Sequence, residues 1–530
     1  MTDAALPAPA VAPKTLTQAD WTKLFLGFGA MVIGQFMAIL DIQIVAASLP
    51  QIQAGVGASA DQVSWIQTAY LIPEVVMIPL SGYLSRLWGT QKVYLASCTG
   101  FIVMSVLTGL SSSIDMMIIT RALQGFIGGA MIPTVFAVAF TAFPPERRVT
   151  ASVIMGLIVT LAPTVGPTLG GHLTEWLSWR WLFFINVPIG LIVLFGVARW
   201  GNFDKGDPSL SKGFDWLGLG VMAAFLMSLQ FVLEEGAKES WFQDDLILGL
   251  TVLAVVSGVV FVWRQLTYRN PIVELRAFAN RNFSIGLMMT AVSGASLFGG
   301  TFLLPQFLSR VRHYSASEVG TTMVISGLSM FITGPIAGRL VRKTDPRLPL
   351  FIGFLLAGWG MYMAHGVTKD WGFWEFAGVQ ACRGVGVMIA MIATQQITMS
   401  TLPQHMVKNA SGLVNLSRNT GGAMGLALLA TSITQQTALY YSDMTSKLQT
   451  GNVEAQTMMA GLAARMAQMG VADPDGAAHK AFSGMMQQQA TVLAFGDSFT
   501  LLAIGCFIAA GVSLLAKPAA GAAPPPSDAH

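Results

Sequence analysis

A short stretch of sequence that occurs twice decides the fold of this chain. Residues 79–86 read Pro-Leu-Ser-Gly-Tyr-Leu-Ser-Arg, and residues 335–342 read Pro-Ile-Ala-Gly-Arg-Leu-Val-Arg. Each copy lies where a long apolar run ends in a basic loop. A weaker match pairs residues 124–125 with residues 383–384, two apolar runs later in each half. We therefore expect two related helical bundles that face each other, as in many secondary transporters. The alternative is a chance match between segments rich in Gly and Leu.

The composition of the 530 residues excludes most classes of soluble protein. Charged residues make up 11% and hydrophobic residues 53%, whereas an ordinary soluble domain is roughly 25% charged. The net charge of +3, with dispersed basic residues, does not fit a nucleic-acid binder. The three cysteines and six histidines have no metal-ligand or catalytic clustering, so we expect no metal, no cofactor and no enzyme. What remains is an all-α polytopic membrane protein.

Fourteen stretches of about 20 mostly apolar residues can each cross a membrane as a helix. With the N-terminus inside, the cytoplasmic loops receive more than twice as many Lys and Arg residues as the outer loops, in agreement with the positive-inside rule. An even number of spans then returns the C-terminus to the cytoplasm. The stretches lie near 24–49, 62–84, 92–111, 114–143, 149–174, 181–200, 214–233, 245–264, 283–308, 317–340, 348–366, 372–400, 407–433 and 493–516.

The repeat divides the chain into two bundles with an insertion between them. The first six spans match the last six, so we expect an N-terminal bundle at 21–200 and a C-terminal bundle at 271–516. The two unmatched spans belong to a linker at 201–270. The tails at 1–20 and 517–530 lack long apolar runs and are expected to be disordered in the cytoplasm.

Five motifs in the first half carry a family resemblance. They are the loop Gly82-Tyr83-Leu84-Ser85-Arg86-Leu87-Trp88-Gly89, the segments Arg121-Ala122-Leu123-Gln124-Gly125, 162–171 and 181–190, and the pair Leu40-Asp41. Together they resemble the major facilitator superfamily and, more narrowly, its fourteen-span drug:proton antiporters of the EmrB/QacA type, with EmrB-like multidrug exporters as the nearest group. The resemblance implies the major facilitator fold, with two six-helix bundles and two inserted helices.

The same resemblance implies that these motifs and their repeat copies control gating. Proline bends a helix and glycine lets a neighbouring helix approach closely, so we expect residues 163–171 to form a pivot surface against the other half. Ordinary small-residue packing is the alternative. Many relatives have Asp where this chain has Arg86, which puts the usual contact of that Asp in doubt. The expected gating residues are Gly82, Arg86, Gly89, Gly338, Arg342, Pro163, Gly166, Pro167, Gly170 and Gly171.

Three ionisable residues inside predicted spans are candidates for proton coupling. A charge at the centre of a spanning helix costs roughly 2.5–3.5 kcal/mol on insertion scales. Asp41, Glu74 and Arg121 lie at depths that agree within roughly 6 Å, given a rise of 1.5 Å per residue. Burial favours the protonated carboxyl and a nearby guanidinium favours the carboxylate. A movement that changes the distance to the Arg would therefore load or release a proton. A static ion pair that joins helices is the alternative.

The second half has no ionisable residue where Asp41 and Glu74 would recur, so we expect proton coupling to reside in the first half. Other polar or aromatic residues inside the spans are candidates for a substrate cavity. For Arg418, snorkelling to the inner membrane surface is an equal alternative. The cavity candidates are Gln124, Phe298, Gln395, Gln396, Asn415, Arg418 and Arg383.

The long connection at 434–492 predicts an external helical hairpin. Its apolar residues from Met458 to Met469 recur at helical spacing, and residues 473–476 are typical of a turn. The family resemblance implies that this hairpin contacts a periplasmic adaptor, an EmrA-like membrane fusion protein joined to an outer-membrane channel. Packing over the transporter itself is the alternative.

The pattern as a whole predicts a proton-coupled antiporter in the bacterial cytoplasmic (inner) membrane. Its expected substrates are amphipathic drugs or toxic small molecules. A dedicated exporter of one metabolite and a proton symporter are the alternatives. No phosphate-binding Gly-Lys-Ser/Thr motif is present, which argues against ATP as the energy source.

Overall fold

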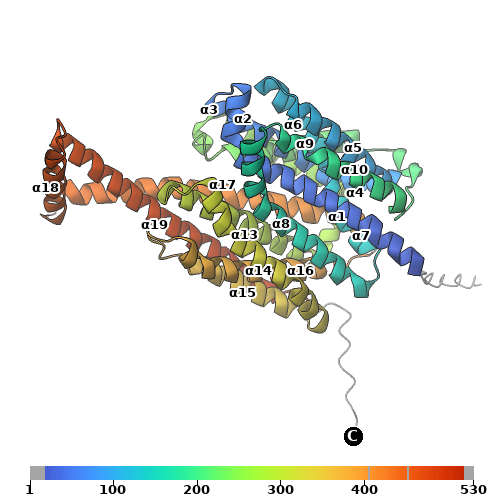
Figure 1. Cartoon of the computed structure of the whole chain (residues 1–530). Helices are drawn as coiled ribbons and strands as arrows, with labels where there is room; N and C mark the ends of the chain where they lie inside the picture. Colours follow the sequence, from blue (N-terminus) through green and yellow to red (C-terminus); the bar gives the residue numbers. More distant parts are fainter. Residues whose placement is uncertain (1–17, 404–405, 450–452, 518–530) are drawn as a thin grey trace, which may run out of the picture.

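The computed structural model describes residues 18–403, 406–449 and 453–517, and these residues form helices joined by short connections. Figure 1 shows one elongated assembly of helices, with the helices of the N-terminal half gathered beside those of the C-terminal half. The predicted all-α fold class is confirmed for the described residues. The predicted terminal tails fall largely on residues 1–17 and 518–530, which lie outside them.

From residue 18 to residue 200 the structure has ten helices, several of which are pieces of one predicted span. The predicted span at 114–143 is divided at residues 129–130, and the span at 181–200 is divided at Ile185. The helices are α1 (Gln18–Ala47), α2 (Leu49–Val56), α3 (Ala60–Val63), α4 (Trp65–Trp88), α5 (Thr90–Gly109), α6 (Ile114–Gly128), α7 (Met131–Thr141), α8 (Pro145–Trp176), α9 (Trp181–Phe184) and α10 (Asn186–Trp200).

The insertion and the C-terminal half follow. The insertion contains η1 (Pro208–Ser211), α11 (Trp216–Glu235), η2 (Trp241–Gln243) and α12 (Asp245–Thr267). The C-terminal half contains η3 (Leu275–Ala279), α13 (Arg281–Val311), α14 (Ala316–Lys343), α15 (Arg347–Tyr362), α16 (Phe373–Ser400), α17 (Val407–Gln449), α18 (Val453–Gln468) and α19 (Pro474–Ser513).

Eleven stretches of helix in the described residues are long and apolar enough to cross a membrane, and α15 is apolar but shorter. The predicted spans at 62–84 and 407–433 coincide with α4 and α17, which carry more polar residues. The chain is therefore a multi-pass membrane protein. The count of fourteen spans and the cytoplasmic termini stay predictions.

The two halves meet closely along α8 and α14. A Cβ atom on Gly338 would lie 2.6 Å from Cγ2 of Val153, and one on Gly334 would lie 2.8 Å from Leu157. The predicted pivot segment at 163–171 reaches the other half through Thr164 and Thr168, which lie against Gly327 and Gly320 of α14. The motif glycine Gly166 instead faces Gln43 of α1 within the same half, where a Cβ would lie 2.6 Å from that side chain. At the contact between the halves, α8 supplies the side chains and α14 supplies the glycines, and glycine lets a neighbouring helix approach closely.

The other motif glycines of α8 pack within the N-terminal half or have open space around them. Gly170 lies against α1, where a Cβ would be 3.0 Å from the Ile44 carbonyl oxygen, and Gly171 has open space around it. Pro163 and Pro167 lie inside α8, which stays helical through both. Arg342, the predicted gating residue of the second repeat, is exposed in the last turn of α14.

The predicted external hairpin is a continuation of two spanning helices. Figure 1 shows that α17 and α19 extend well beyond the bundle and that α18 lies across their far ends. The predicted turn at 473–476 is instead a helix start, because the Asp473 side chain accepts a hydrogen bond from the Gly476 amide and Pro474 occupies the first turn of α19. The segment points away from the bundle and does not fold back over it.

Candidate functional site

A buried ion pair lies at the centre of the N-terminal half. Nη1 of Arg121 in α6 lies 2.6 Å from Oδ2 of Asp41 in α1, and both side chains are 0% exposed. The two residues are distant in sequence, and packing of α6 and α1 in one bundle brings them together. The predicted common depth of Asp41 and Arg121 is therefore a direct contact in the structure.

Amide side chains complete the hydrogen bonding of the Asp41 carboxylate. Nδ2 of Asn186, the first residue of α10, donates to Oδ1 of Asp41 at 2.7 Å and also reaches Oγ of Ser105 at 3.0 Å. Nε2 of Gln124 lies 3.4 Å from the same Asp41 oxygen. Gln124 was predicted to line a substrate cavity, but it belongs to this network. Asn186 was not predicted, although an amide early in the apolar segment 181–190 was a usable signal.

The Arg121 guanidinium is held on several sides. Its Nε donates to the Ile66 carbonyl oxygen at 3.2 Å, and its Nη1 donates to Oε1 of Gln124 at 3.0 Å. Its Cζ lies 4.3 Å from the ring centre of Tyr70, which is a cation–π distance. Helices α1, α4, α6 and α10 thus meet at one charged centre with no exposure to solvent.

Glu74 connects this centre to a cavity. It lies one helical turn after Tyr70 in α4, is buried, and is within electrostatic reach of both Arg121 and Asp41. Its side chain also lines a cavity of about 250 Å³ between the two halves. The arrangement places a carboxyl group between a buried ion pair and a space that a small molecule can enter, and such a group can exchange its proton when its surroundings change.

The cavity brings together some of the predicted residues. Phe298 of α13, together with Asn415 and Arg418 of α17, lines it from the C-terminal half. The guanidinium of Arg418 lies 4.9 Å from the ring centre of Phe136. Because Arg418 lines the cavity, its position matches the cavity alternative and not snorkelling. Gln230 and Glu234 of the inserted helix α11 also line the cavity and were not predicted.

The remaining cavity candidates lie elsewhere. Arg383 is buried within the C-terminal half, where its Nη2 donates to Oγ of Ser326 at 2.6 Å. Nε2 of Gln396 donates to Oγ of Ser152 at 3.3 Å across the interface of α16 and α8. Gln395 is buried beside it in α16. Apolar runs predict the depth of these side chains in the membrane, but they do not predict which face of the helix carries them.

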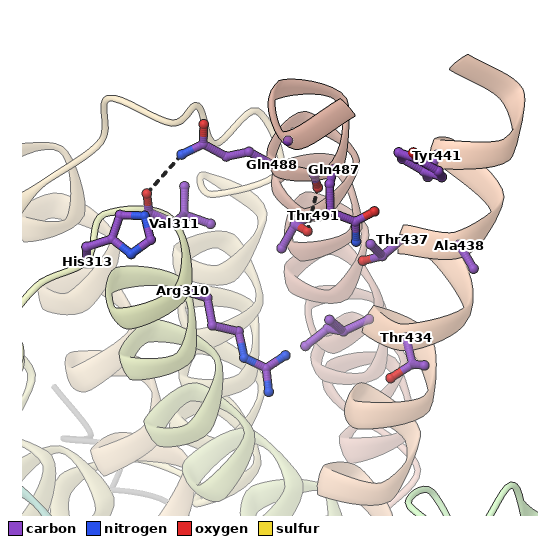
Figure 2. Close-up of a pocket in the computed structure, with 12 residues that line it drawn as sticks. Arg310, Val311, His313, Thr434, Thr437, Ala438, Tyr441, Gln487, Gln488 and Thr491 are labelled. Atoms are coloured by element: carbon purple, nitrogen blue, oxygen red, sulfur yellow. Dashed lines mark hydrogen bonds between the residues drawn. The ribbon is translucent and has the colours of Figure 1, made fainter. Parts of the chain in front are cut away.

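A second and larger hollow, of about 740 Å³, lies where the extensions of α17 and α19 leave the bundle. Figure 2 shows Arg310 of α13 and His313, just after that helix, on one side, with Thr437 and Tyr441 of α17 and Gln487 of α19 on the other. This hollow is built by helices of the C-terminal half and lies apart from the ion pair.

The motif loop between α4 and α5 closes a contact between the two halves. A Cβ on Gly82 would lie 2.8 Å from the Lys408 carbonyl oxygen, so α17 packs directly on this glycine. Gly89 ends α4 with a φ of 88°, a left-handed conformation that favours glycine. The Arg86 carbonyl oxygen accepts a hydrogen bond from the Asp207 amide at 2.8 Å, which fixes the segment after α10 against the loop.

Asp204 in that segment supplies a carboxylate at the motif loop, where Arg86 carries the opposite charge. Its Oδ1 accepts a hydrogen bond from the Thr90 amide at 2.7 Å, in the first turn of α5. Its Oδ2 lies 2.5 Å from Nζ of Lys408. A carboxylate is stabilising at a helix N-terminus. One carboxylate therefore caps α5 in the first half and pairs with a cation at the start of α17 in the second half.

Comparisons with known proteins give a consistent picture. The family described as Major Facilitator Superfamily matches residues 31–426. The chain is 37% identical over 494 residues to the colistin resistance protein EmrB of Acinetobacter baumannii, covering 92% of this chain and 95% of that protein. It is 30% identical over 506 residues to the multidrug export protein EmrB of Escherichia coli, covering 94% and 97%.

A more distant relative and a solved structure are also similar. The fatty acid resistance protein FarB of Neisseria gonorrhoeae is 28% identical over 499 residues, covering 94% of this chain and 96% of that protein. The crystal structure of the human organic anion transporter MFSD10 (TETRAN) has a TM-score of 0.53 at 12% identity, covering 92% and 98%. That likeness concerns the fold alone.

The Asp204 contact generates a prediction about closure of this end. Asp204→Asn keeps an acceptor for the Thr90 amide but loses the ion pair with Lys408. A charged hydrogen bond contributes about 1.5–3 kcal/mol. We therefore expect the open state of the contact between α4 and α17 to be populated at least about tenfold more than in the wild type. Hydrogen–deuterium exchange in residues 79–88 and 406–416 should rise accordingly.

The matched control is Asp207→Asn in the same segment, because the Asp207 side chain bonds only Ser209 among the described residues. Exchange in both ranges should stay at the wild-type level in that variant. Equal exchange in the Asp204→Asn and wild-type proteins would show that the ion pair does not hold the two halves together.

Proposed function

The chain belongs to the Major Facilitator Superfamily, as its motifs predicted. On that premise we propose that it exports amphipathic drugs or toxic small molecules across the bacterial inner membrane by proton antiport. Transport would proceed by alternating access, in which the two halves open the central cavity to one side of the membrane at a time. The inward proton gradient would supply the energy.

The observation that carries this proposal is the buried pair of Asp41 and Arg121 beside a cavity that Glu74 lines. A carboxylate that loses contact with its guanidinium in a low-dielectric interior takes up a proton, and restored contact releases it. Occupation of the cavity and rearrangement of the halves would change that contact. Glu74 would couple the cavity to the ion pair, because its side chain lines the cavity and lies within electrostatic reach of Asp41 and Arg121.

The substrate class is proposed from the relatives and from the cavity walls. The similar proteins carry names that refer to colistin resistance, multidrug export and fatty acid resistance. The cavity combines apolar residues such as Leu71 and Phe298 with the charged residues Glu74 and Arg418. Such a lining suits molecules with an apolar body and a polar or charged end. A dedicated exporter of one metabolite and a proton symporter remain alternatives.

We also propose a role for the extension formed by α17, α18 and α19. It points away from the bundle (Figure 1), and it exposes large apolar side chains, among them Leu439, Met458 and Met469. An exposed apolar surface far from the bundle suits contact with another protein. The proposed partner is an EmrA-like adaptor that leads to an outer-membrane channel, with the bundles at 21–200 and 271–516 acting as the pump.

Proton antiport makes a prediction about the energy source. Inverted membrane vesicles that contain the protein and are energised by a proton gradient should accumulate severalfold more of an amphipathic fluorescent dye than vesicles without the protein. A protonophore should abolish the accumulation, because proton entry is the proposed driving force. Vesicles given ATP with the proton-pumping ATPase inhibited serve as the control. Accumulation that persists without a proton gradient would contradict proton antiport.

The proposed adaptor contact makes a prediction about the extension. Replacement of 450–485 by a short flexible linker should leave proton-driven dye transport in vesicles near the wild-type rate, because the cavity and the ion pair lie in the bundle. The same variant should lose drug resistance in whole cells if an adaptor binds there. Full resistance in whole cells would refute the adaptor contact, whereas lost vesicle transport would show that the extension belongs to the pump.

A further inference from the structure

The inserted helix α11 is fixed to both halves of the protein and does not simply face lipid. Its Phe231 ring lies 5.6 Å from the ring of Trp65 at the start of α4. Just after α11, Nε1 of Trp241 donates to Oγ1 of Thr431 in α17 at 2.9 Å. The helix therefore closes the side of the cavity where α4 and α17 meet, and its residues become part of the cavity wall.

Two neighbouring glutamates at the end of α11 have different surroundings. The Glu235 carboxylate is satisfied, because it accepts a hydrogen bond from the Thr68 hydroxyl at 2.8 Å and pairs with Lys238 at 2.9 Å. Glu234 lines the cavity instead. Its Oε1 accepts a hydrogen bond from Nε2 of Gln230 at 2.9 Å, one turn earlier. Glu235 thus anchors the helix, whereas Glu234 presents a carboxylate to the cavity.

Glu234 forms no ion pair among the described residues, although the half-exposed ammonium of Lys238 lies within electrostatic reach of it. The ionisable residues that line the cavity are Glu74, Glu234 and Arg418. No ion pair joins Arg418 to either carboxylate among the described residues, and its guanidinium lies over Phe136. The nearby Lys238 is engaged by Glu235. Two carboxylates against one guanidinium, in a partly desolvated space, favour a ligand that carries positive charge.

We propose that Glu234 of the inserted helix is a specificity-determining residue that binds the positive charge of cationic amphipathic substrates. Gln230 holds the carboxylate in place, and the apolar wall around Phe298 contacts the hydrophobic body of the ligand. The two inserted helices therefore add a recognition element to the two bundles. This inference rests on the proposed export function, which supplies the ligand class.

Binding measurements on the purified full-length protein in lipid nanodiscs test the proposal. Tetraphenylphosphonium serves as the cationic probe and chloramphenicol as the uncharged one. We expect Glu234→Gln to raise the Kd for tetraphenylphosphonium about tenfold, the effect of losing one attractive charge at moderate distance in a partly screened site. The Kd for chloramphenicol should stay within about twofold, which also reports that the variant is folded.

Two further variants separate recognition from a structural role. Glu234→Asp keeps the charge and should restore most of the affinity for tetraphenylphosphonium. Glu239→Gln removes an exposed carboxylate just after α11 that does not line the cavity, and it should leave that affinity unchanged. Wild-type affinity for tetraphenylphosphonium in Glu234→Gln, or an equal loss for both probes, would overturn this inference alone. Failure of the wild-type protein to bind either probe would count against the proposed export function as well.

Discussion

An ion pair without solvent is the constraint on which the N-terminal half depends. Asp41 and Arg121 are fully buried, and removal of one partner from a buried pair costs about 3–5 kcal/mol because the other charge is left alone. Amide side chains, a backbone carbonyl and an aromatic ring surround the pair and stabilise the two buried charges. Since these groups come from α1, α4, α6 and α10, the pair also fixes how those helices are arranged. The proton coupling that we propose is based on this same pair, because it both holds the bundle together and lies close to the cavity.

The second constraint is that the halves must approach closely and still separate. Along α8 and α14 the approach depends on the missing side chains of Gly334 and Gly338. At the loop between α4 and α5 it depends on Gly82 and on the ion pair of Asp204 with Lys408. Surfaces held by a glycine contact and one partly exposed ion pair separate at modest cost. This combination suits a contact that forms and breaks in each transport cycle.

The sequence predicted the fold and the centre of the site because both leave strong local signals. Long apolar runs predict helices, and Asp41, Glu74 and Arg121 are conspicuous because charges are rare in such runs. Asn186 was missed because an amide among apolar residues is far less unusual than a charge. Glu234 was missed because the predicted span ended at residue 233, and Asp204 because its two partners come from helices far apart in the chain. All three residues gain their roles through tertiary contacts.

The central claim is that the Asp41 carboxylate takes up and releases the coupled proton. The most direct measurement is substrate-induced proton release from purified protein in weakly buffered detergent solution with a pH-sensitive dye. The account predicts that wild-type protein releases protons when an amphipathic substrate is added, and that Asp41→Asn still binds the substrate but releases none. Proton release at the wild-type level from the double variant Asp41→Asn, Glu74→Gln would contradict the account.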